Sequence, residues 1–116
     1  MKSLERGGFL LCLKGGGYMN KIPNSVKVAG VTYEVKQVSN LLLNYDLLGQ
    51  AHYLNSEIQI DSSLSDERKE QIFVHELLHA IFKESGYDEQ DEDTINRLAI
   101  TLHQVLKDND LKIYKE

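Results

Sequence analysis

The sequence has little cysteine, proline or tryptophan, with one Cys, one Pro and no Trp in 116 residues. A single cysteine, Cys12, cannot form a disulfide within the chain, so disulfides do not hold this protein together, and a reducing cytoplasm suits it. No apolar run approaches the roughly 20 residues that span a bilayer. The net charge of −5 lacks the basic excess of a nucleic-acid-coating protein. We therefore expect a cytoplasmic protein with neither a membrane nor a nucleic-acid partner.

The composition is that of a small globular protein. Hydrophobic residues make up 41% and charged residues 27% of a 13.2 kDa chain. This apolar content is too high for a disordered protein, and the length allows one core rather than two. The sequence therefore predicts a single domain.

Residues 1–18 differ in character from the rest of the chain. Their apolar stretch, Phe9 to Leu13, is too short for a signal peptide, and three glycines follow it. The codons for Lys14 to Tyr18 must be rich in G just ahead of the ATG for Met19, like a bacterial ribosome-binding site. We predict that Met19 is the natural start. Residues 1–18 would then be a non-native or disordered extension, and 19–116 the domain.

The part after Met19 begins with alternating apolar and polar residues, which is typical of strands. Two runs near 25–29 and 31–38 flank Ala29-Gly30 and predict a β-hairpin. Two more, at 50–54 and 57–61, predict a second hairpin. Residues 41–48 form either a short helix or an irregular connection. These patterns favour a small antiparallel β-sheet.

Two helices are predicted after the strands. The first follows an N-cap at Ser63 or Ser65 and runs to about Ser85, with Gly86 as its stop. The second runs from about Asp91 to Lys107 and carries an apolar stripe on one side, formed by Ile95, Leu98, Ala99, Leu102, Val105 and Leu106. A short strand is expected at 111–114. The predicted class is α+β, a small antiparallel sheet followed by two packed helices.

The chemistry lies in His75-Glu76-Leu77-Leu78-His79, an H-E-x-x-H motif within the first predicted helix. Residues four apart share a helix face, so His75 and His79 can bind one metal ion. Glu76 lies about 100° round the helix, where it can act as the general base. The surrounding residues are apolar, and burying three polar side chains among them is costly unless they serve a site. Zinc is the ion that this donor set favours.

A zinc site of this kind needs a third protein ligand, and the acidic run at 88–93 offers several. Glu92 lies about 60° from the centre of the apolar stripe, whereas Asp93 lies about 160° away and faces water. Glu92 is the preferred ligand, with Asp91 or Glu89 as alternatives. Asn96, one turn after Glu92, could orient Glu92 or hold the free ring nitrogen of a ligand histidine.

Two other histidines are weaker candidates for the site. His103 is about 16 Å along the helix from Glu92 and cannot share its metal. It is expected at the surface or at the edge of the core. His52 lies on a predicted strand, where it could stabilise an oxyanion or simply be exposed.

Over roughly residues 21–109, the chain resembles the ImmA/IrrE-type zincins and short phage- or prophage-encoded metallopeptidase-like proteins. The similar segments are His75-Glu-Leu-Leu-His79-Ala80 and Glu92-Asp-Thr-Ile-Asn96-Arg-Leu-Ala99. The resemblance implies that Glu92 is the third zinc ligand. It also implies a cytoplasmic enzyme that cleaves a protein, such as a repressor, with an extended substrate added to the sheet edge near 56–61.

The chain departs from that group at three positions and in length. Leu78 replaces a glycine, Thr94 and Ile95 replace Glu-Ala, and no further domain for recognising a repressor follows. The predicted function is therefore that of a zinc metallopeptidase that hydrolyses a peptide bond of a protein substrate. The alternative is a catalytically silent, zinc-containing module that binds a host or phage protein and does not require Glu76.

Overall fold

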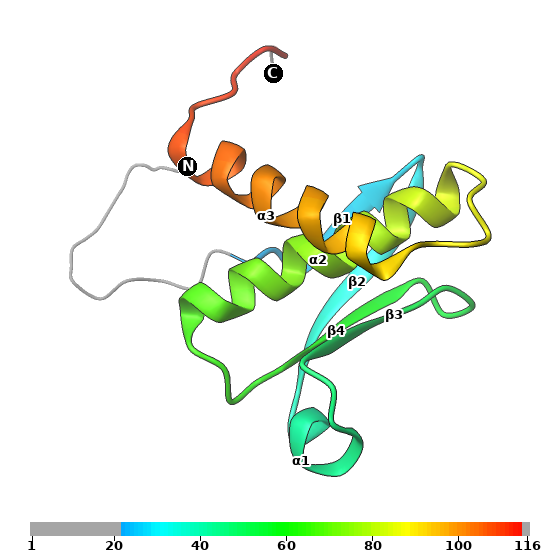
Figure 1. Ribbon diagram of the computed structural model, residues 1–116, viewed down its shortest axis with the longest axis vertical. Coiled ribbons are helices and arrows are strands. Elements are labelled where there is room, and N and C mark those ends of the chain that lie inside the picture. Colours follow the sequence, from blue (N-terminus) through cyan, green and yellow to red (C-terminus); the bar gives the residue numbers. More distant parts are fainter. Residues whose placement is uncertain (1–21, 115–116) are drawn as a thin grey trace.

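The computed structural model describes residues 22–114, so Cys12 and the predicted extension 1–18 lie outside the described residues. The elements follow in the order β1 (Ser25–Val28), β2 (Val31–Val38), α1 (Leu41–Tyr45), β3 (Gly49–His52), β4 (Glu57–Asp61), α2 (Asp66–Glu84) and α3 (Glu92–Asp108) (Figure 1). The predicted α+β class is confirmed. The undecided stretch 41–48 contains the short helix α1.

The sheet has four strands in the order β1-β2-β4-β3. Both predicted hairpins form with antiparallel pairing, but β2 and β4 pair in parallel. The sheet is therefore mixed, and the expectation of a purely antiparallel sheet is wrong at this pairing. Alternation specifies each strand and its faces, whereas the parallel pairing depends on how α1 and β3 carry the chain back between β2 and β4.

The first hairpin turns where its residues tolerate positive φ. Ala29 has φ 52° and Gly30 has φ 83°, and a two-residue loop of type I′ needs positive φ at both positions. In β4, Ile58 and Ile60 are fully buried, whereas Glu57 and Gln59 lie on the other face and hydrogen-bond to each other. Both features follow from the sequence pattern.

Helix α2 lies across the sheet and is the central element of the fold (Figure 1). It begins after Ser65, whose Oγ accepts a hydrogen bond from the Arg68 N–H, and it ends just before Gly86, where φ is 98°. One side of α2 joins the sheet in a core whose buried members are Val28, Tyr33, Val35, Ile58, Ile60 and Ala80. The other side packs against α3 through Val74, Leu78, Ile95 and Ala99. Both faces of α2 are covered, as its apolar sequence predicts.

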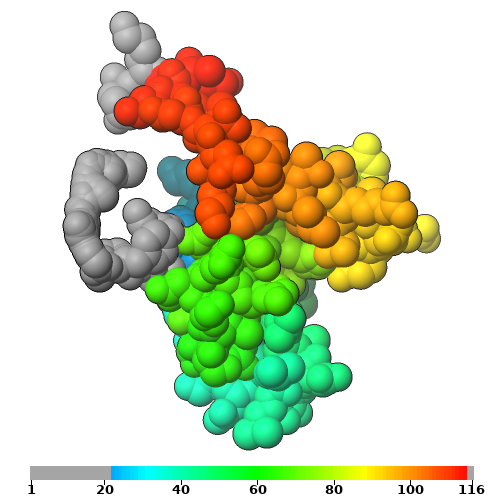
Figure 2. All heavy atoms as spheres, turned by 60° about the vertical axis from the view of Figure 1, so that its left-hand side comes forward, coloured from blue at the N-terminus to red at the C-terminus, as the bar shows by residue number. Residues whose placement is uncertain are grey.

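Helix α3 buries less of its apolar stripe than expected. Ile95 and Ala99 are buried, but Leu98 and Leu106 are 47% and 48% exposed. Residues 111–114 form no strand, so that expectation is wrong. Figure 2 shows α1 at one end of the molecule, with α3 and the residues after it at the other. Within residues 22–114, no helix combines the length and the apolar character needed to cross a membrane.

Candidate metal centre

Helix α2 presents His75 and His79 on one face, one turn apart. Their ring centroids are 5.0 Å apart, and the side chains are only 17% and 16% exposed. This is the arrangement that the spacing of four predicts. The histidines lie in the middle of a 19-residue helix that is packed on both sides, so their backbone positions are held firmly.

Helix α3 brings the third group, because its first residue is Glu92. The two carboxylate oxygens of Glu92 lie 3.1 Å from His75 Nε2 and 2.9 Å from His79 Nε2. Asp91 immediately before it is the N-cap, and its carboxylate accepts hydrogen bonds from the Thr94 N–H and Oγ1–H. These bonds lower the pKa of Asp91. The cap determines where α3 begins and so places Glu92 opposite the histidines.

The side chain of Gln90 contacts the other ring nitrogen of His79, Nδ1. Its Oε1 accepts a hydrogen bond from His79 Nδ1–H at 2.5 Å and another from the Tyr53 hydroxyl at 3.3 Å. A neutral imidazole has a single N–H, so this bond assigns the proton to Nδ1 and leaves Nε2 with a lone pair facing Glu92. That is the tautomer a metal-binding histidine requires.

The three donor atoms fit one metal ion. A ligand atom from each of His75, His79 and Glu92 lies within 4.8 Å of the other two. Ligands about 2.0–2.2 Å from a tetrahedral zinc ion are about 3.3 Å from each other, close to the two measured distances. His79 faces an oxygen at each ring nitrogen, so a cation between Nε2 and Glu92 would fit the charge and the lone pairs there. The residues present therefore suit a zinc ion.

Glu76 lies beside this group but takes no part in it. The residue is only 8% exposed, and its carboxylate makes no hydrogen bond with any residue between 22 and 114. Burial raises the pKa of Glu76 to about 7; nearby His79 lowers it and Glu92 raises it. The enclosed side-chain atoms without a partner among residues 22–114 are His52 Nε2 and His103 Nε2, so the carboxylate oxygens of Glu76 still reach solvent beside the metal-binding group. A carboxyl group whose pKa is raised by burial in such a place is a candidate for a functional role.

The edge strand β3 passes close to Glu76. A Cβ on Gly49 would lie 2.6 Å from Ile72 Cγ2, 2.9 Å from the Gln59 carbonyl oxygen and 3.4 Å from Glu76 Cγ. Only glycine allows the edge strand to approach α2 this closely. The expected substrate-binding edge near 56–61 is wrong, because β4 lies between β2 and β3. The free edge next to the motif belongs to β3.

The remaining predicted candidates lie outside the metal-binding group. Glu89 is exposed and is not a member of it, and Asp91 serves as a helix cap, so Glu92 is the acid that faces both histidines. Among residues 22–114, Asn96 makes no hydrogen bond to either ligand histidine or to Glu92, and Gln90 holds the other ring nitrogen of His79. His103 is a core-edge residue near Glu70, as expected.

His52 lies on β3, and its buried Nε2 has no hydrogen-bond partner among the described residues. Neither Gln90 nor Gly49 was predicted from the sequence to lie at the site. Gln90 is the one amide in an acidic run, and Gly49 opens a strand, so both carried a usable signal.

The comparisons with known proteins give no match. No family model fits this chain, and neither a curated protein nor a solved structure is significantly similar to it. The geometry of the site therefore carries the functional argument.

Proposed function

We propose that this protein is a zinc-dependent metallopeptidase that hydrolyses a peptide bond of a protein substrate. The observation that carries the proposal is the side chain of Glu76, which is mostly buried and hydrogen-bonds to no residue between 22 and 114, beside a His-His-Glu group of metal-binding geometry. A module that used zinc only for folding would have no need of this carboxylate, and burying it costs free energy.

The residues would divide the work as follows. His75, His79 and Glu92 hold the metal, and Gln90 keeps His79 in the required tautomer. Zinc in a site with three protein ligands supplies a Lewis acid that polarises a carbonyl group and lowers the pKa of water. Glu76 accepts the proton of the attacking water and passes it to the leaving amine. Burial raises the pKa of Glu76, and a carboxyl group with a raised pKa can both accept a proton and release it again.

The free edge of β3 supports a peptide rather than a small molecule as the substrate. The strand is at the end of the sheet and lies against α2 beside Glu76. An extended peptide could pair with this edge through its backbone.

The test measures zinc and cleavage separately. Zinc per chain is determined by mass spectrometry, and cleavage sites are mapped on the proteome of cells that express the protein. Glu76→Gln should retain the zinc of the wild type, while cleavage falls by about 10²–10⁴-fold, the usual contribution of a positioned base. Glu67→Gln is the matched control, because Glu67 lies exposed on the same helix and pairs with Lys107.

Two results would contradict the proposal. A folded protein that takes up no zinc would rule out the site. Zinc uptake without cleavage by the wild type, together with biological effects that are the same in wild type and Glu76→Gln, would favour the silent binding module instead.

A further inference from the structure

A groove runs between α2 and α3 and ends at the metal centre. Its volume is about 320 Å³, which is in the range of about 300–1,000 Å³ that small-ligand pockets have. Each helix lines it with residues at positions i, i+3, i+4 and i+7. These are Arg68, Gln71, Ile72 and His75 from α2, and Asn96, Ala99, Ile100 and His103 from α3. Because His75 also belongs to the metal-binding group, the groove reaches that group at one end.

The groove is lined without a single acidic residue, although the chain carries a net charge of −5. The guanidinium of Arg68 makes no ion pair or hydrogen bond with residues 22–114; only its backbone N–H is engaged. Arg97 provides a contrast, since it pairs with Asp93 at 3.0 Å on the exposed side of α3. An unpaired arginine in a groove without acids favours an anionic occupant.

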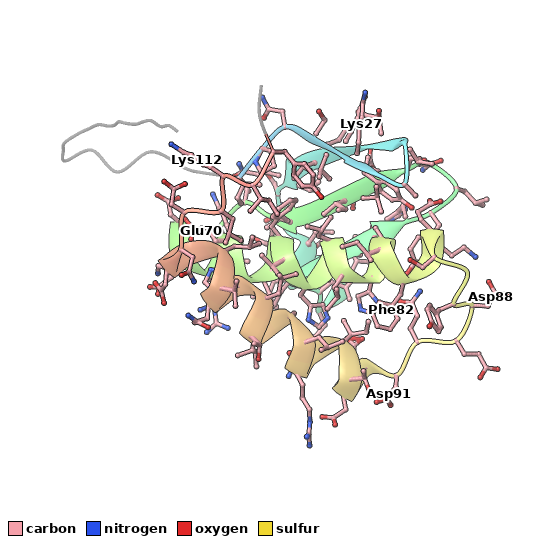
Figure 3. All side chains as sticks on the ribbon, turned by 90° about the horizontal axis from the view of Figure 1, so that it is seen from above. Lys27, Glu70, Phe82, Asp88, Asp91 and Lys112 are labelled. Atoms are coloured by element: carbon pink, nitrogen blue, oxygen red, sulfur yellow. The ribbon has the colours of Figure 1, made fainter. Side chains whose placement is uncertain are left out.

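Glu70, two residues after Arg68 in α2, faces His103. Glu70 lies where the first half of α2 meets the second half of α3 (Figure 3), and its carboxylate is 3.7 Å from His103 Nε2. Glu70 is 16% exposed and is not among the residues that line the groove. The guanidinium of Arg68 therefore remains able to bind an anion.

The lining has two parts that match a particular side chain. Ile72, Ala99 and Ile100 provide an apolar surface, and the amides of Gln71 and Asn96 provide hydrogen-bond donors in addition to Arg68. A glutamate side chain combines methylene groups with a carboxylate that can accept two hydrogen bonds from arginine. Lysine and arginine side chains lack the acceptor, and purely apolar side chains would leave the amides and Arg68 unpaired.

We propose that this groove is a specificity pocket for a glutamate side chain of the substrate, close to the scissile bond. The proposal rests on the proposed peptidase function, because it assigns the substrate class of that same site. Arg68 determines the preference for negative charge, and it does so without touching the reacting atoms.

The first experiment measures binding and needs no catalysis. Full-length, zinc-loaded protein is titrated with the capped peptide acetyl-Ala-Ala-Glu-Ala-Ala-amide and with its glutamine counterpart, and amide NMR shifts are followed. The glutamate peptide should bind about 3- to 10-fold more tightly, with shifts at Gln71 and Asn96. Arg68→Gln should remove the difference, and Arg97→Gln should preserve it. Equal affinities, or a difference that survives Arg68→Gln, would overturn the pocket.

The second experiment measures cleavage of a proteome-derived peptide library. The wild type should enrich glutamate at one position beside the cleaved bond, and Arg68→Gln should lose this enrichment while still cleaving. Cleavage without an acidic preference would overturn the pocket but keep the peptidase. Arg68-dependent binding of the glutamate peptide with no cleavage at all would overturn the peptidase and leave an acid-binding groove.

Discussion

The described chain buries two acidic side chains, in two regions that treat them in opposite ways. Asp61, at the end of β4, is 1% exposed, and Glu76, in α2, is 8% exposed. The carboxylate of Asp61 accepts hydrogen bonds from the Leu42 N–H and from the N–H and hydroxyl of Ser63. These bonds hold the pKa of Asp61 below its usual value. Glu76 has no such bonds, and burial raises its pKa.

The two acids differ in what surrounds their carboxylates: Asp61 has hydrogen-bond donors around it, and Glu76 has none among residues 22–114. Asp61 satisfies backbone donors at the start of α1 and after β4, so its charge stabilises the corner between them. Glu76 has no hydrogen-bond partner within residues 22–114, and burial disfavours its charge, so it does not stabilise the fold as Asp61 does. The same contrast recurs one residue apart in α3, where Asp91 caps the helix and Glu92 faces the histidines.

The largest expected effect concerns this second pair of acids. Glu92→Ala removes a metal ligand, so zinc affinity should fall by more than about 100-fold, beyond the usual cost of losing an outer partner. Zinc should then no longer raise the melting temperature. Asp91→Ala should lower the melting temperature by a few degrees through the lost cap, with zinc binding retained. Zinc titration and thermal melts check both. If Glu92→Ala binds zinc as tightly as the wild type does, Glu92 is not the third zinc ligand.

The next effect separates Asp61 from Glu76 by stability. Asp61→Asn turns an NH₂ group toward backbone donors, so the melting temperature should fall by about 5–10 °C at pH 7. Glu76→Gln should leave the melting temperature of zinc-free protein unchanged or raise it, because no partner is lost. Asp110→Asn, at an exposed position, serves as the control. Similar losses for Asp61→Asn and Glu76→Gln would contradict the distinction.

The pH dependence of the Asp61 effect has a definite sign. A carboxyl whose pKa is lower in the folded state stabilises the protein above its unfolded value, and this contribution is lost as the pH falls through the folded value. The difference between wild type and Asp61→Asn should therefore be full at pH 7 and shrink below about pH 4. Thermal melts between pH 3 and pH 7 measure it. A difference that stays constant with pH would mean that the charge of Asp61 does not matter.

The smallest expected effect concerns Gln90. Gln90→Ala removes the acceptor for His79 Nδ1–H but no metal ligand, so zinc affinity should fall by about 10-fold. Gln90→Glu keeps an acceptor and should restore most of the affinity. A matched change at Gln104, which is exposed near the end of α3, should have no effect. If Gln90→Ala binds zinc as tightly as the wild type does, the tautomer does not depend on this bond.

Most individual elements could be predicted because their signals are local. The alternation in 25–38 and the Ala29-Gly30 turn specify a hairpin, and Ser65 and Gly86 mark the ends of α2. Leu98 and Leu106 show where such signals fail, because both belong to the apolar stripe of α3 and yet remain about half exposed. The stripe indicates which residues can be buried, but not how much of the stripe a neighbouring element covers.

The sequence by itself determined that His75 and His79 share a helix face, because a period of 3.6 residues leaves no other arrangement. It also narrowed the third ligand to the acidic run before α3. The sequence already favoured Glu92 over Asp91 and Glu89, and the tertiary structure added the reason: Asp91 caps α3, whereas Glu92 faces both histidines. The parallel pairing of β2 with β4, the contact of Gln90 with His79 and the approach of Gly49 to α2 were decided in three dimensions. They join residues that are distant or irregular in sequence, and no local periodicity encodes such contacts.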